Sequence, residues 1–322
     1  ALEIRKGLSL MGERLDYATS LNNLAELYKL MGRYREALPL YEEALAIYKD
    51  LPPKEKHPRY VAVLQNLAGL YSRTGRVDEA ADLYEQAASV QKLLSPPGRH
   101  PSYVVTLNNL ATLYKEEGKI DKAEGLYREV VEILAERPPL GHHPEYGSAL
   151  NNLAELYNTA KRYKEAEPLH LAALIIRKDL APRGKHPDYV TSLHNLAAAY
   201  YHMGRYRQAS RLLTQSLKLS REFIQHQFPG LSEREKAQFI STMRYRFEII
   251  WQFAETTSSI LPETRGLGYD ALLATKAVLL DGAKKMRERI LQSDDRDLKN
   301  SFARWLALKD RKSTRLNSSH YS

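Results

Sequence analysis

Carboxamide side chains recur at a fixed interval, and they are the residues of this sequence best suited to binding. One asparagine returns every 43 residues, at Asn23, Asn66, Asn109, Asn152 and Asn195. The position before it carries Asn22, Gln65, Asn108, Asn151 and His194. An amide offers both hydrogen-bond donors and acceptors, so a row of amides suits the main chain of an extended peptide. The alternative is a local hydrogen bond that fixes neighbouring helices.

Other residue types that could do chemistry have simpler explanations. The sequence contains no cysteine, and it shows no Ser/His/Asp grouping, Gly-rich phosphate loop or HExxH pattern. Histidines of recurring His-Pro pairs come once per repeat, so about 10 Å per helix layer separates them and a turn role is favoured over metal binding. Recurring tyrosines fit core packing better than a stacking platform. We therefore expect a chain that is not an enzyme and has no catalytic, cofactor or metal site.

The elements that position the amides follow from the same period. The motif Leu21 to Tyr28 returns at Leu64, Leu107, Leu150 and Leu193, and such self-similarity is typical of a solenoid. Within the motif the apolar residues form one helical stripe, and Asn23 lies on roughly the opposite side at about 100° per residue. Glycine ends this helix, a second amphipathic helix follows, and proline ends that one. The matching turn glycines are Gly32, Gly75, Gly118 and Gly204, and the matching prolines are Pro53, Pro96, Pro139 and Pro182.

The small and large residues of each unit resemble the pattern of tetratricopeptide repeats. The positions that carry the resemblance are Leu21, Leu24, Ala25, Tyr28, Ala37, Tyr41 and Ala44. It covers residues 1 to about 228 and implies an all-α fold, a right-handed superhelical solenoid of helix-turn-helix repeats. First helices line the concave groove in that family, so the asparagines should form a polar ladder along it. The later repeats depart from the pattern at Lys161, His170, Leu213 and Ser216.

The "LNNLA-LY" helix and the long inter-repeat loop look like the repeats of kinesin light chains and many bacterial signalling proteins. After them, Ser232 and Glu235 predict a capping box that opens a helix through Phe239, Ile240, Phe247, Ile250 and Trp251. Residues 231–235 and 271–280 together resemble the helical connector of bacterial proteins that join such repeats to a caspase-like CHAT domain. The protease His and Cys of that family lie further downstream than this sequence extends.

The period also predicts the organisation of the chain. Residues 1–12 align with the second helix of a truncated repeat, residues 13–228 form five 43-residue repeats, and residues 229–309 form a helical connector before a missing C-terminal domain. Residues 310–322 resemble the translation of a short-read sequencing adapter, and we expect them to be an artefact. Both ends then indicate a gene fragment.

Charge and hydropathy limit the classes of partner that we expect the chain to bind. The formal charge is +9, but basic and acidic residues are interspersed. The groove positions Glu26, Gly69, Thr112, Glu155 and Ala198 are acidic or neutral, which counts against nucleic acid. The sequence contains no run of about 18 apolar residues, so it predicts no membrane-spanning helix. We expect a cytoplasmic protein that binds a protein or extended peptide, with a small-molecule ligand disfavoured.

Two functions remain open at this point. The chain is either the sensor and regulatory region of a CHAT-type peptidase or a free-standing adaptor that resembles kinesin light chain. Downstream sequence with a His and Cys pair would distinguish them.

Overall fold

Helices are the only regular elements among the residues that the structure describes. The computed structural model describes residues 11–50, 58–94, 101–137, 143–180, 187–226 and 232–271, with residues 274, 292 and 300. The all-α prediction is therefore confirmed over these ranges. The predicted helix of residues 1–12, the stretch 272–280 except Ala274, and residues 310–322 lie largely or wholly outside them.

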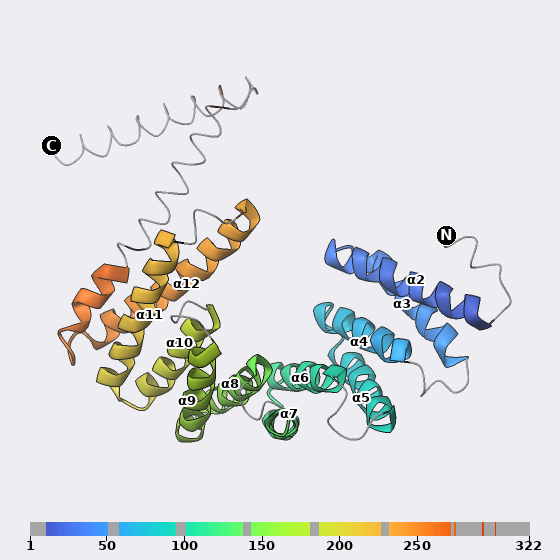
Figure 1. Ribbon diagram of the computed structural model, residues 1–322, viewed down its shortest axis with the longest axis horizontal. Coiled ribbons are helices and arrows are strands. Elements are labelled where there is room, and N and C mark those ends of the chain that lie inside the picture. The colour runs from blue at the N-terminus through green and yellow to red at the C-terminus, as the bar shows by residue number, and fades with distance from the viewer. Residues whose placement is uncertain are drawn as a thin grey trace. The chain divides into compact units, whose positions relative to one another are not determined.

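Eight of the described helices follow one another as four hairpins (Figure 1). These hairpins are α2–α3, α4–α5, α6–α7 and α8–α9, and α10 and α11 come next in the sequence. Their bounds are α2 Met11–Leu30, α3 Tyr34–Lys49, α4 Pro58–Arg73, α5 Val77–Leu94, α6 Pro101–Glu116, α7 Ile120–Ala135, α8 Pro144–Thr159, α9 Tyr163–Leu180, α10 Pro187–His202 and α11 Tyr206–His226. From α2 to α10, each helix packs mainly against its neighbours in sequence.

Two compact units make up the chain, residues 1–203 and 204–322. The first holds α2 to α10, with the five recurring asparagines and the five residues that precede them. The second holds α11 and α12 (Glu233–Thr257), where Ser232 and Glu235 form the predicted capping box. Phe247 and Ile250 are buried in α12, whereas Trp251 is 41% exposed.

Turn glycines stop the first helix of each hairpin as predicted. Gly32, Gly75, Gly118 and Gly204 have φ between 73° and 80°, a left-handed conformation that glycine adopts without steric cost. In the fourth hairpin Lys161 takes the same conformation with φ of 59°. A side chain there costs about 1–2 kcal/mol in backbone strain.

Proline and histidine begin the next hairpin. Pro58, Pro101, Pro144 and Pro187 are the first residues of α4, α6, α8 and α10, where the missing N–H of proline leaves no intrahelical bond unmade. His143 caps α8: its Nδ1 accepts from the Tyr146 N–H at 3.3 Å, and its Nε2 lies 2.9 Å from the Leu134 carbonyl. Here the histidine has the predicted turn role.

Small residues and tyrosines build the core. Ala25, Ala37 and Ala44 are completely buried where the two helices of a hairpin meet. Four of the recurring first-helix tyrosines are buried, and Tyr28 is half-buried. The four buried copies are Tyr71, Tyr114, Tyr157 and Tyr200. The core prediction for these tyrosines is confirmed.

Candidate peptide-binding surface

The recurring asparagines lie away from the core but are not equally accessible. Asn23 and Asn109 are exposed, whereas Asn66, Asn152 and Asn195 are half-buried. In the preceding position, Asn22, Gln65 and Asn108 are half-buried, while Asn151 and His194 are only 6% and 8% exposed. The row therefore presents a surface in which Asn23 and Asn109 reach furthest into solvent.

Hydrogen bonds between successive first helices explain the half-buried members. On α4, α8 and α10, the recurring asparagine donates its Nδ2 to an asparagine Oδ1 on the preceding first helix. That acceptor lies 44 residues earlier in the sequence. These donor–acceptor distances are 3.0 Å from Asn66 to Asn22, 3.3 Å from Asn152 to Asn108, and 3.0 Å from Asn195 to Asn151. These amides thus join neighbouring repeats, as the alternative explanation expected, and each retains further hydrogen-bonding capacity.

The ladder is interrupted between the second and third hairpins. Gln65 donates its Nε2 to the Thr106 hydroxyl at 2.5 Å and to the Ser102 carbonyl at 3.3 Å. Asn109 instead hydrogen-bonds to Tyr84 on α5 of the preceding hairpin: burial raises the pKa of the Tyr84 phenol, and the bond with Asn109 offsets part of that rise. Asn109 is therefore exposed, and its partner in the preceding hairpin is the Tyr84 hydroxyl rather than an amide.

Hydroxyls of buried second-helix tyrosines support the surface beside the amides. Tyr41 donates to Glu26 at 2.7 Å, and the Tyr127 hydroxyl lies 2.9 Å from that of Thr112. Burial, followed by the bond to Glu26, raises the pKa of Tyr41, so its phenol stays protonated. These bonds pass through the hairpin and fix the helix that carries the amides.

A second set of polar contacts joins the hairpins on the side of the second helices. Tyr71 donates to Glu42 at 3.1 Å and Tyr114 to Glu85 at 2.5 Å, so each first-helix tyrosine bonds to the preceding second helix. A cation also lies over these rings, with Arg76 3.8 Å from the Tyr71 centroid. Sequence reasoning treated the tyrosines as packing residues and missed these bonds. The recurring glutamate 29 residues before the tyrosine was the available signal.

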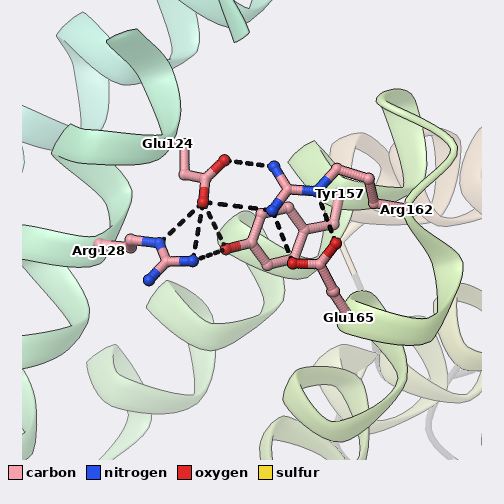
Figure 2. A network of polar contacts seen from close by, with 5 residues as sticks. All are labelled: Glu124, Arg128, Tyr157, Arg162 and Glu165. Carbon is pink, nitrogen blue, oxygen red and sulfur yellow. Dashed lines mark hydrogen bonds and ion pairs between the residues drawn. The ribbon is translucent and has the colours of Figure 1, made fainter. Parts of the chain in front are cut away.

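Figure 2 shows the most extensive of these contacts, between the third and fourth hairpins. Arg128 occupies the position that is Glu42 in the first hairpin and Glu85 in the second, and we call such equivalent places in the 43-residue repeat register positions. Glu124, one turn earlier in α7, accepts a hydrogen bond from the Tyr157 hydroxyl at 2.9 Å. Arg128 donates to the Tyr157 oxygen at 2.8 Å. Arg162 donates to Glu124 at 2.5 Å and holds Glu165 through two further bonds of 2.8 and 2.6 Å.

The electrostatics of this network favour a charged Glu124. Burial by itself raises the pKa of the Glu124 carboxyl, but hydrogen bonds from Arg162, Tyr157 and Arg128 outweigh it and the pKa lies below its ordinary value. Burial, then the Glu124 bond, raises the pKa of the Tyr157 phenol. The carboxylate and the phenol proton thus stabilise each other across the junction.

The described residues hold neither a cluster of metal ligands nor a membrane-spanning helix. No group of three or more His, Cys, Asp or Glu residues suited to a metal occurs among the described residues. In the same part of the chain, no helix is long and apolar enough to cross a membrane.

The repeat pattern and the hairpin geometry agree with one family. The tetratricopeptide-repeat model matches residues 1–50, 16–93, 60–136 and 145–222. The chain belongs to the tetratricopeptide-repeat family. No curated protein matches the sequence.

Solved structures narrow the resemblance within that family. The nearly identical TPR-like repeats of a kinesin light chain candidate from Podosopora anserina are 30% identical, with a TM-score of 0.57, covering 65% of this chain and 96% of that chain. BtubC (BKLC) from P. vanneervenii is 28% identical, with a TM-score of 0.57, covering 66% of this chain and 82% of that chain. This tetratricopeptide-repeat chain thus has structural neighbours of the kinesin-light-chain type.

Proposed function

We propose that this chain binds an extended peptide segment of a partner protein along the amide row of its first helices. The observation that carries the proposal is the exposed position of Asn23 and Asn109 on the side of the helix opposite the core, in line with three further amides. Membership of the tetratricopeptide-repeat family, whose scaffolds generally bind proteins or peptides, supports it.

The chemistry of the row suits a main chain more than a particular side chain. Each amide can donate to a peptide carbonyl and accept from a peptide N–H. The half-buried amides that bond to a preceding repeat retain a second donor proton, and Asn109 carries no such bond to Gln65. Since one neutral hydrogen bond contributes about 0.5–1.5 kcal/mol, useful affinity requires a peptide that spans several hairpins.

The test begins with a displayed library of 12-residue peptides, because the natural partner is unidentified. The tightest selected peptide is titrated by calorimetry against the unmodified chain and against Asn109→Ala. We expect a 3- to 10-fold weaker Kd for the folded chain and only a small drop in melting temperature, since Asn109 is exposed and its bond to the preceding hairpin is the one with Tyr84. Gln86→Ala removes an exposed amide from α5 and is the matched control.

Two outcomes would contradict this proposal. The first is an unchanged affinity for Asn109→Ala. The second is an equal loss in Gln86→Ala, which would place the peptide on the second helices.

For the intact protein, we propose that this scaffold senses a partner and controls an attached CHAT-type caspase-like peptidase. The support is the resemblance of residues 231–235 and 271–280 to the connector of such proteins. The alternative is a free-standing adaptor, which the kinesin-light-chain neighbours favour. Sequencing the coding region downstream distinguishes the two: a His and Cys pair on an α/β pattern supports the peptidase, and a stop codon after the repeats supports the adaptor.

A further inference from the structure

A cavity of about 470 Å³ opens between α5 and α7, the second helices of the second and third hairpins. Its apolar lining comes from Ala88, Leu107, Leu110 and Leu126, with Gly125 at one wall. The α6 residues that line it belong to the apolar stripe, on the side of the helix away from Asn109. The cavity is therefore separate from the amide row.

Two small residues create this space. The register position of Ala88 is Leu45 in the first hairpin and Val131 in the third, and that of Gly125 is Asp82 in the second and Pro168 in the fourth. Both small residues line the same cavity. A Cβ built on Gly125 meets no atom within 4 Å, so the space beside it is open.

Tyrosine–glutamate pairs hold the rim on two sides. Tyr114 donates to Glu85 at 2.5 Å, and Tyr103 donates to Glu129 at 2.6 Å. Lys92 lies 3.5 Å from Glu129 and 5.7 Å from the Tyr103 centroid. Because these groups already satisfy one another, the rim is preformed and an entering group does not have to order it.

The helices on either side of the cavity are acidic. Four acidic residues and one lysine lie on α5, and four acidic and two basic residues lie on α7. Asp78, Asp82 and Glu132 are exposed and lie outside the cavity lining. The lining itself holds three acidic residues and two lysines, Lys92 and Lys122. The net negative charge therefore comes from both helices together and extends beyond the cavity.

We propose that this cavity is a docking site for a protein helix that inserts one bulky apolar side chain and carries basic residues on either side of it. The apolar lining accepts the anchor, in the way that interface hot spots insert an aromatic side chain into a preformed pocket. The flanking basic residues meet the carboxylates of α5 and α7, which orients the helix and speeds its association. This site is independent of the amide row.

The probe is a synthetic 16-residue helical peptide with a central tryptophan, a lysine four residues to either side on the same face, and alanine and glutamine elsewhere. Two control peptides replace the tryptophan by alanine or both lysines by glutamate. Binding to the full chain is followed by tryptophan fluorescence and calorimetry. We expect each control peptide to bind at least 10-fold more weakly than the probe.

Two variants fill the cavity from opposite walls. Gly125→Leu and Ala88→Leu should each weaken the probe at least 10-fold, with an unchanged or higher melting temperature, and the smaller Gly125→Ala is the matched control. The open space at Gly125 makes the first variant tolerable even if Ala88→Leu fails to fold.

Equal binding of the probe to Gly125→Leu and the unmodified chain would overturn the proposal. So would equal binding of the alanine or glutamate control peptide. Binding of 3-(2-aminoethyl)indole alone as tightly as the probe would also overturn it, because the cavity would then be a small-molecule site. The selected peptide of the amide row should bind Gly125→Leu normally, which separates this test from that of the proposed function.

Discussion

Two junctions of the same solenoid differ in how they are held. Between the third and fourth hairpins, Glu124 joins Tyr157, Arg128 and Arg162, and the Asn152 amide bonds to Asn108. Between the second and third hairpins, Tyr114 bonds to Glu85 in place of the five-residue network, Gln65 and Gln91 bond to Thr106 and Ser102 in place of the amide pair, and a cavity opens. One 43-residue pattern thus produces two junctions with different polar contacts, one a charged network and the other a set of separate hydrogen bonds beside a cavity.

The difference teaches that a few substitutions at register positions decide how a junction behaves. Gln65 in place of an asparagine turns the amide toward Thr106. Ala88 and Gly125 remove side chains that neighbouring hairpins possess. Both proposed binding surfaces, Asn109 and the cavity, lie at the junction between the second and third hairpins.

Acid should weaken the fourth hairpin most. His170 is completely buried, and burial, followed by the charge of Arg177, lowers its pKa from 6.5 to about 4. Between pH 6.5 and pH 4, the His170 imidazole is therefore protonated in the unfolded chain but neutral in the folded chain. The free energy of unfolding that is present above pH 6.5 is lost as the pH falls toward 4. We expect a loss of about 2–3 kcal/mol in unfolding free energy over this window.

Urea unfolding at pH 7 and pH 4.5 measures this effect. His170→Tyr is the control, because the three preceding hairpins carry Tyr41, Tyr84 and Tyr127 at the same position. The variant should lose less stability on acidification than the unmodified chain. The same pH dependence in both would exclude His170 as the cause.

Removing the central carboxylates compares the junctions directly. Glu124→Ala should lower the unfolding free energy by about 2 kcal/mol, because it leaves Arg162, Arg128 and Tyr157 without their shared acceptor. Glu85→Ala removes one tyrosine bond and should cost about 1 kcal/mol. Equal losses in urea denaturation would show that the Glu124 network contributes no more than the Tyr114–Glu85 bond.

The amide row gives a smaller effect. Asn152→Ala removes the bond to Asn108, and Asn109→Ala removes the hydrogen bond to the buried Tyr84, so each should cost about 1 kcal/mol. Hydrogen exchange should accelerate in α8 for the first variant and in α6 for the second. Unchanged exchange of α6 in Asn109→Ala would exclude a structural role for the Tyr84 bond.

Much of the fold could be predicted because it depends on local chemistry. Glycine at φ near 73°, proline at the first helical position and the Ser232 capping box each act within a few residues, and all three agree with the sequence pattern. The candidate surface was predictable only in part. The helical period places Asn109 away from the core, but it does not show which atoms meet across a junction.

The rest depended on partners far apart in sequence. The Asn66–Asn22 bond joins residues 44 apart, and Tyr157 meets Glu124 although the register position of its partner is Arg128. A repeat period identifies equivalent positions, whereas these bonds depend on side-chain length and on helix spacing. The cavity is similar, since Ala88 and Gly125 become significant only once α5 and α7 lie side by side.

The smallest effect concerns the turn between α8 and α9. Lys161→Gly should raise the unfolding free energy by about 0.5–1 kcal/mol, because glycine relieves the left-handed strain at φ of 59° but loses more entropy on folding. The reciprocal change Gly118→Lys, at φ of 73°, should lower it by about 1 kcal/mol. Thermal unfolding monitored by circular dichroism measures both, and a destabilised Lys161→Gly would refute the strain.

The interrupted amide ladder also has a mechanical consequence. Asn66, Asn152 and Asn195 each bond back to the hairpin before them, whereas Gln65 bonds forward to Thr106 and Ser102 of the next one. A force applied between the ends of residues 11–203 is carried equally by each junction, and each junction between successive first helices is crossed by at least one of these side-chain amide bonds. Under tension, the hairpins would therefore resist separation in series, with no junction that depends on apolar packing alone.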